Sequence, residues 1–271
     1  MTVQDLTQLL ISALDLPDSC RVNQRIPKKM LIEHGAPTGT DRRLINSIIE
    51  EIQWLAALKP NTVGVAEYRD SEREYLEIAI LCVITRGAEM EEGVVVAPAG
   101  IKSRPVNIAR LAELVHRAIP YPVVLVLETS YGLFLSLAHK RWAQNEADKV
   151  VLDEDGMAVD QVFGLADNHP FLRTLALAQQ PQSNLLTLYQ GWMDCLTAWQ
   201  AAQYTGTFVF AATPAQAIAR REALRTCRRL EQDGARLRAM AAKEKQMAKL
   251  VELNLALKRL GIELDSAREQ L

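Results

Sequence analysis

The stretch that decides the fold is "ELVHRAIPYPVVLVLETSYGLFLSLAHKRW", residues 113–142. Its first residues complete an amphipathic helical pattern over 105–118. Pro120 and Pro122 end that helix, because a residue that precedes a proline favours an extended conformation. The segment "VVLVLE" at 123–128 is apolar on both faces, which is typical of a strand inside a sheet that is covered on both sides. After the turn "SYG", the segment "LFLSLAHKRW" predicts a neighbouring strand.

The amino-terminal part of the chain shows helical spacing. Apolar residues predict a short helix over 2–16. A basic turn follows over 21–37, where Pro27 is suited to the first turn of a helix. The strongest amphipathic pattern predicts a helix over 41–58, which Pro60 ends.

The period changes after this helix. Alternating and β-branched residues predict strands over 61–70 and 74–87, which pair most simply as an antiparallel hairpin. A third short strand is predicted at 91–100, with Pro98 at a sheet edge or a strand end because proline cannot donate to a ladder. A last strand is predicted near 149–156.

The carboxyl-terminal part returns to helical spacing. Thr213 and Pro214 are a typical helix start, and nearly everything from there to Leu271 can be one helix. Such a helix has to bury its leucine stripe, so it folds back near Gly234, pairs with its own copy, or docks on a partner protein. The stripe steps by three and four, which is the spacing of a coiled-coil seam: Leu250, Leu253, Leu257, Leu260 and Leu264.

These patterns predict an α+β fold. The mixed sheet lies between the helices over 41–58 and 105–118, and the order of elements also fits a degenerate restriction-endonuclease-like core. The predicted segments are an N-terminal helix (1–19), an α+β core domain (20–165), a helical region (166–212) and a long terminal helix that forms a coiled coil (213–271).

Composition narrows the class of protein. The chain has 271 residues, of which 49% are hydrophobic, and can bury one sizeable core with an appendage. No apolar segment reaches the ~18 residues of a membrane span, and the acidic start does not read as a signal peptide, so we expect a cytoplasmic bacterial protein. The cysteines are far apart and lack C-x-x-C spacing, so reduced thiols are expected rather than a zinc site or disulfides: Cys20, Cys82, Cys195 and Cys227.

The formal net charge of −2 conceals a basic segment. Residues 220–249 carry ten Lys or Arg against four acids, so this segment is +6 and the remainder is −8. Local basic charge of this kind allows salt-sensitive contact with nucleic acid, although charged helices usually face water.

Four motifs together resemble the bacterial family known as domain of unknown function 4391. They are "RIPKK" at 25–29, "VHRAIPYPVVLVLE" at 115–128, "LSLAHKRWAQNE" at 135–146 and "KQMAKLVELN" at 245–254. The resemblance implies no established activity. It implies a genomic context: members of that family look like small proteins that accompany helicases and DNA methyltransferases in restriction-like or phage-defence loci.

Basic residues at a predicted strand end form the candidate binding site. Such a set can bind phosphate, since Lys and Arg neutralise the charge of the nucleic-acid backbone without recognising its base sequence. The alternative is a solvated rim whose long stems cover apolar surface. The candidate residues for nucleic-acid or partner binding are Lys28, Lys29, His116, Arg117, His139, Lys140 and Arg141.

A divergent metal-dependent nuclease is the alternative function. Its ligands for Mg²⁺ would be Glu67, Asp70 and Glu77, yet the residue two places after Glu77 is Ala79, where such enzymes have a lysine. The chain also lacks Gly-rich phosphate loops, and its histidines lack metal-ligand spacing. We therefore expect no catalytic residue and no cofactor.

The leading prediction is a non-catalytic interaction subunit of a bacterial DNA-targeting defence or restriction-type complex. The coiled coil would bind a helicase or methyltransferase subunit or a second copy of the chain. The basic rim would contact nucleic acid, and no membrane contact is expected.

Overall fold

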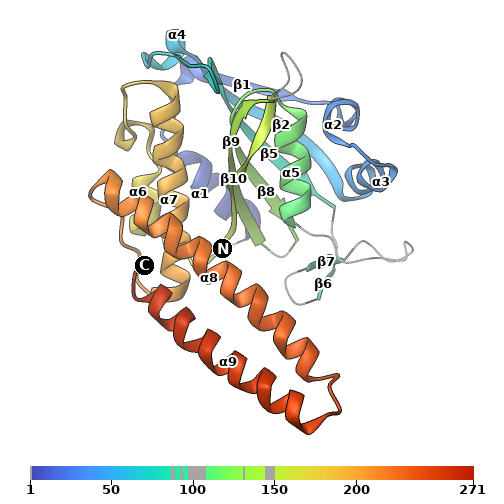
Figure 1. The fold of residues 1–271 in the computed structure, drawn as a ribbon. Helices are drawn as coiled ribbons and strands as arrows, with labels where there is room; N and C mark the ends of the chain where they lie inside the picture. Colours follow the sequence, from blue (N-terminus) through green and yellow to red (C-terminus); the bar gives the residue numbers. More distant parts are fainter. Residues whose placement is uncertain (1, 87–88, 92–93, 97–107, 131, 144–149) are drawn as a thin grey trace. The chain divides into compact units, whose positions relative to one another are not determined.

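The computed structural model describes residues 2–86, 89–91, 94–96, 108–130, 132–143 and 150–271 (Figure 1). The chain divides into two compact units, Met1–Leu196 and Thr197–Leu271. The boundaries predicted at residues 19, 165 and 212 do not coincide with this division.

The first unit is built on a six-stranded sheet with the order β1–β2–β5–β8–β9–β10. Strands β5 and β8 run parallel, and the other neighbours run antiparallel. The sheet is therefore mixed and, with the helices, confirms the predicted α+β class. The six strands are β1 (Arg21–Arg25), β2 (Ile49–Leu58), β5 (Ile78–Thr85), β8 (Val123–Thr129), β9 (Gly132–Trp142) and β10 (Val150–Val162).

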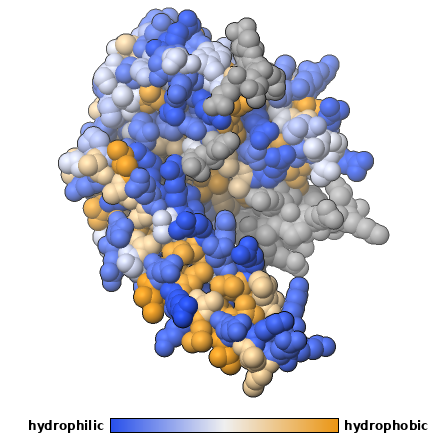
Figure 2. Space-filling model, viewed as in Figure 1, coloured by the Kyte–Doolittle hydropathy of each residue, from blue (hydrophilic) through white to orange (hydrophobic). Residues whose placement is uncertain are grey.

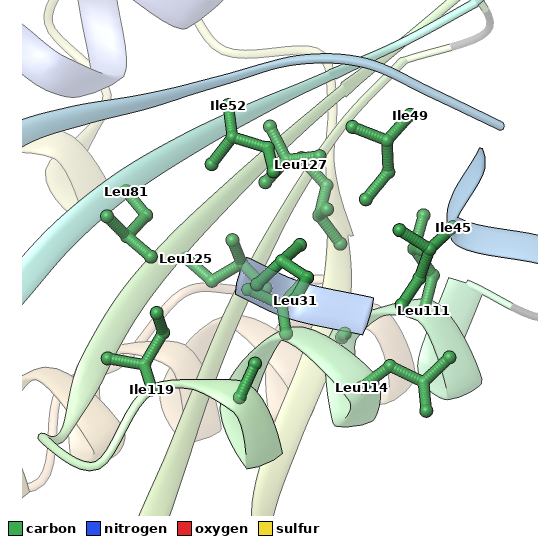
Figure 3. Close-up of a cluster of buried hydrophobic side chains, with 14 of the residues drawn as sticks. Leu31, Ile45, Ile49, Ile52, Leu81, Leu111, Leu114, Ile119, Leu125 and Leu127 are labelled. Carbon is green, nitrogen blue, oxygen red and sulfur yellow. The ribbon is translucent and has the colours of Figure 1, made fainter. Parts of the chain in front are cut away.

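Helices cover both faces of this sheet (Figure 1). On one face, α2 (Lys28–Gly35), α3 (Gly39–Ile48) and α5 (Ile108–Ala118) bury leucine and isoleucine side chains against β2, β5 and β8, as Figure 3 shows. Helix α1 (Val3–Ala13) covers the other face. The cavity beside α1 is lined by Cys82 and Ile84. Along β5 these residues alternate with the core residues Leu81 and Val83, so their side chains lie on the opposite face of the sheet.

The stretch 113–142 folds as predicted. Helix α5 ends at Ala118, β8 begins at Val123, and the segment between them holds both prolines. Strand β8 lies inside the sheet and β9 is its antiparallel neighbour. The predicted last strand is also confirmed as β10, which pairs with β9.

The predicted helix over 41–58 is wrong in its second half. Helix α3 stops at Ile48, and Ile49–Leu58 forms β2, which pairs with β1 and β5. The pairing register of β2 with β5 shifts twice, between Ile49 and Glu51 and between Trp54 and Ala56. Each bulge changes which face the following side chains occupy, so the apolar spacing of this strand imitates a helix.

The predicted hairpin between 61–70 and 74–87 is also corrected. Residues 60–63 form the short helix α4 (Pro60–Val63), and only β3 (Tyr68–Arg69) and β4 (Glu74–Tyr75) pair across the turn. The long strand β5 pairs instead with β2 along one edge and with β8 along the other. In the region of the predicted third strand, β6 (Glu89–Glu91) pairs with β7 (Val94–Val96), and Pro98 lies outside the described residues.

The remaining helical segments follow β10. They are α6 (Pro170–Thr174), the 3₁₀ turn η2 (Leu177–Gln179), α7 (Leu185–Thr205), α8 (Pro214–Ala241) and α9 (Met247–Arg268), and the 3₁₀ turn η1 (Asp18–Cys20) lies before β1. Thr213 caps α8 through its side chain, with Pro214 as the first helical residue, as predicted. Across the part of the chain that the structure describes, no helix combines the length and the hydropathy that crossing a bilayer requires.

The single helix predicted from Thr213 to Leu271 is replaced by two helices, α8 and α9. The chain reverses at residues 242–246, where the Glu244 carboxylate accepts hydrogen bonds from the backbone N–H groups of Lys245 and Gln246. Gly234 is therefore not the reversal point; it lies inside α8, and a Cβ placed there would be 3.4 Å from a methyl group of Leu260. Helices α8 and α9 pack on each other as a helical hairpin.

Candidate functional site

The structure buries His139 and Lys140, at the end of β9. Strand β9 pairs with β8 on one side and β10 on the other, and the pairing with β10 extends to Trp142. The basic end of β9 thus stays inside the sheet and does not project from its rim. An exposed basic rim at these residues was predicted, and their burial contradicts it.

The Lys140 ammonium group is held by main-chain oxygens. Its Nζ donates hydrogen bonds to the carbonyl oxygens of Ile119 and Tyr121, in the segment that connects α5 to β8. Burial lowers the pKa of Lys140 to about 7, because desolvation disfavours the charged form. Lys140 therefore ties the proline-flanked turn to β9.

His139 belongs to a buried chain of hydrogen bonds. Its Nδ1 lies 2.6 Å from the Tyr75 hydroxyl and its Nε2 lies 2.9 Å from Gln190 Oε1. Because the Gln190 amide nitrogen donates to Asp194 at 2.9 Å, Gln190 Oε1 faces His139 and accepts a hydrogen bond from the Nε2–H group. The Tyr75 hydroxyl then donates to Nδ1, which fixes one tautomer of the imidazole and joins β4, β9 and α7.

His116 is fully buried on α5. Its Nε2 lies 3.0 Å from the Ser136 hydroxyl, which itself donates to the Ala158 carbonyl oxygen. Among the described residues, the Nδ1 of His116 has no hydrogen-bond partner. Burial, with a smaller effect from the positive charge of Lys140, holds the pKa of His116 well below its ordinary value. This histidine is a neutral core residue.

The other predicted basic residues lie apart from this cluster. Lys28 Nζ donates to the carbonyl oxygen of Ile49, while Lys29 lies 3.6 Å from Glu33 in the same helix. Arg117 pairs with Glu113 at 2.7 Å on α5. The seven predicted binding residues therefore do not form one exposed patch.

The three acids of the nuclease alternative are not brought together into a metal site. Glu67 and Asp70 are exposed, and Asp70 accepts hydrogen bonds from the Tyr68 hydroxyl and from the N–H groups of its own turn, which lower its pKa. Glu77 is buried, and its carboxylate lies 3.1 Å from Lys59 Nζ. In the described ranges, no group of three His, Cys, Asp or Glu residues could hold a metal ion.

A cavity of about 190 Å³ opens where the proline-flanked turn meets the end of β9. Sequence reasoning singled out the PYP and AHKR motifs but did not expect them to meet. Their proximity follows from the antiparallel pairing of β8 with β9, in which Val124 faces Leu137, and the hydrogen bonds of Lys140 hold the turn against the end of β9. The lining residues are Glu74, Leu76, Pro120, Tyr121, Lys140, Arg141, Trp142 and Val150.

The hairpin of the second unit carries two apolar stripes on α9. The predicted leucine seam is half-buried, and its members Leu260 and Leu264 pack against Cys227, Leu230 and Ala267. The seam is thus used inside the chain. A second stripe, here called the outer stripe, is exposed on the opposite face of α9 and consists of Met247, Val251, Leu255 and Ile262.

Comparison with known proteins identifies a family for this chain. No curated protein and no solved structure matches the chain. One family model matches residues 14–264, which is most of the chain and includes all four motifs named above. The chain belongs to the family described as domain of unknown function DUF4391.

Proposed function

We propose that this protein is a non-catalytic assembly subunit of a bacterial DNA-targeting defence or restriction-type complex. Its helical hairpin would dock on a helicase or DNA methyltransferase subunit. The observation that carries the proposal is the outer stripe of α9, an exposed apolar face on a helix whose other apolar face is already covered.

The outer stripe has the geometry of a helix-docking surface. Its members are spaced by four, four and seven residues, which places them on one face of a helix. Figure 2 shows apolar side chains gathered on the surface of the hairpin. Amphipathic helices bind partners through anchors at this spacing, and an apolar stripe of this length is costly to leave in water.

The charge within the stripe favours a different protein over a second copy. Lys258 falls between Leu255 and Ile262 on the same helix face. In a parallel pair of copies Lys258 would face itself, and in an antiparallel pair centred on the stripe it would face Val251. Neither arrangement neutralises the lysine. The fitting occupant is a partner helix with an apolar face and one carboxylate opposite Lys258.

The rest of the hairpin supports an acidic partner. Helix α8 carries seven arginines and three acids. An acidic surface beside the docking helix would be attracted to this charge and oriented by it. The helicase or methyltransferase identity of the partner rests on the family context, and the nuclease alternative gains no support from the positions of its three acids.

The experiment is co-expression of the tagged full-length chain with the products of its neighbouring genes. We expect a helicase or methyltransferase subunit to co-purify, Val251→Asp to abolish this, and Val209→Asp to leave it intact. Val209 is a matched control because it is 56% exposed, against 53% for Val251, and lies outside the hairpin.

Two results would overturn the assignment. One is a chain that purifies alone in the presence of all its neighbours, and the other is a complex that Val251→Asp does not weaken. A homodimer that Val251→Asp dissociates would replace the partner protein with a second copy.

A further inference from the structure

We propose that the cavity between the PYP turn and the end of β9 holds the base of an unpaired nucleotide. This inference builds on the nucleic-acid contact expected of a DNA-targeting subunit. It concerns the first unit, whereas the docking stripe lies in the second, so each can fail without the other.

The size of the cavity suits one aromatic ring system. It measures about 190 Å³. An engineered protein cavity of about 150 Å³ is large enough to bind benzene. The cavity is therefore large enough for one nucleic-acid base and too small to enclose most of a larger ligand. Leu76, Pro120 and Val150 give it apolar walls.

Two aromatic side chains at the cavity are presented by a constrained backbone. Tyr121 is 37% exposed and stands between Pro120 and Pro122, which restrict its conformation before any ligand arrives. Trp142 donates its backbone N–H to the carbonyl oxygen of Glu72 at 2.7 Å and pairs with Val150 of β10. A base that stacks on such a surface loses little affinity to ordering of the backbone, and stacking on Tyr or Trp is how proteins hold unpaired bases.

The charges around the cavity favour the phosphate that accompanies a base. Arg141 and Lys140 line it together with Glu74, whose carboxylate is paired with Arg69. Asp153 lies 4.0 Å from Arg141 but is closer to Arg73, at 2.7 Å. Among the described side chains at the cavity, positive charge is therefore in surplus at Arg141, which is suited to a backbone phosphate next to the bound base.

A recess of this kind selects unpaired nucleotides. A base inside a duplex is stacked and paired on its edges, and it can enter a pocket only if it is flipped out at a cost of a few kcal/mol. The expected ligand is thus a single strand, such as the strand displaced when a helicase partner opens DNA.

The test is fluorescence anisotropy of the full-length protein with three labelled probes of equal length. These are a single-stranded oligothymidylate, the matching duplex, and a strand of abasic sites that keeps the phosphates. We expect the oligothymidylate to bind about tenfold more tightly than the abasic strand and the duplex.

Variants assign the binding to the cavity. Tyr121→Ala should weaken oligothymidylate binding about tenfold, while Tyr121→Phe should preserve it because the ring is retained. Phe163→Ala is the matched control, an exposed aromatic residue outside the lining. Equal thermal stability of the variants would confirm that truncation of Tyr121 left the fold intact.

The proposal is overturned if none of the probes binds, if the abasic strand or the duplex binds as tightly as oligothymidylate, or if Tyr121→Ala behaves like Phe163→Ala. Val251→Asp should leave oligothymidylate binding unchanged. Loss of co-purification together with normal oligonucleotide binding would show that the two surfaces are separate.

Discussion

The two units differ in how much large apolar surface they expose. The first unit buries His116, His139 and Lys140 within or against its sheet. The second unit has 75 of the 271 residues, yet it holds eight of the eleven large apolar side chains that are exposed among the described residues. Buried polar groups fix a structure, whereas exposed apolar groups are available to a partner. The contrast supports the proposal that the hairpin, and not the sheet, is the docking surface.

The largest expected effect is the loss of Lys140. Lys140→Ala would leave the carbonyl oxygens of Ile119 and Tyr121 without their donor, and it should lower the free energy of unfolding by about 3 kcal/mol. Lys29→Ala, at an exposed lysine, should change it by less than about 0.5 kcal/mol. Urea unfolding monitored by tryptophan fluorescence compares the two. Equal effects would mean that Lys140 is not a structural residue.

The next effect is a pH dependence from His116. Its pKa in the folded state is well below the ordinary value, whereas in the unfolded chain it takes up a proton near pH ~6.5. Below that pH the unfolded state binds more protons, so stability should fall by about 1.4 kcal/mol per pH unit. His116→Leu should remove this slope from unfolding measured between neutral and mildly acidic pH, and His34→Leu should retain it. An unchanged slope in His116→Leu would contradict the buried neutral histidine.

Breaking the His139 chain should have a smaller effect. Tyr75→Phe removes the buried hydrogen bond that the hydroxyl donates to His139 Nδ1, at a cost of about 1–2 kcal/mol. Gln190→Ala should cost a similar amount, and the double variant should cost less than the sum because the two residues share one imidazole. Strict additivity in thermal unfolding would contradict a single connected chain.

The smallest effect is a gain in the hairpin. Gly261 lies inside α9 with open space around its Cβ position, so Gly261→Ala should raise stability by about 1 kcal/mol through helix propensity. At Gly234 the added Cβ would lie 3.4 Å from Leu260, so the gain from Gly234→Ala should be smaller. A lower melting temperature of Gly261→Ala, measured by circular dichroism, would show that the added methyl group does not fit at this position of α9.

Local sequence patterns predicted those helices and strands in which the spacing of apolar residues matches the buried face of the element. The prolines around Tyr121 and the apolar run of β8 fixed a helix, a turn and an interior strand, and Thr213 marked the start of α8. Strand β2 could not be predicted in this way, because its two bulges changed the phase of an alternating pattern.

The candidate site was less accessible to sequence reasoning. A basic triplet ordinarily marks a surface, and the burial of Lys140 depends on carbonyl groups that lie some twenty residues earlier in the chain. The leucine seam was predicted as a coiled coil, and two of its members, Leu260 and Leu264, pack against side chains of α8 in the same chain. The outer stripe was missed because Lys258 interrupts its apolar spacing.

The most direct test of the central claim is the mass of the purified co-expressed particle by light scattering. For the wild-type chain we predict the 30.2 kDa of one copy plus the mass of a helicase or methyltransferase subunit, and for Leu255→Asp the 30.2 kDa of the free chain alone. A mass of 30.2 kDa for both, or the same larger mass for both, would contradict the assignment of the outer stripe as the docking surface.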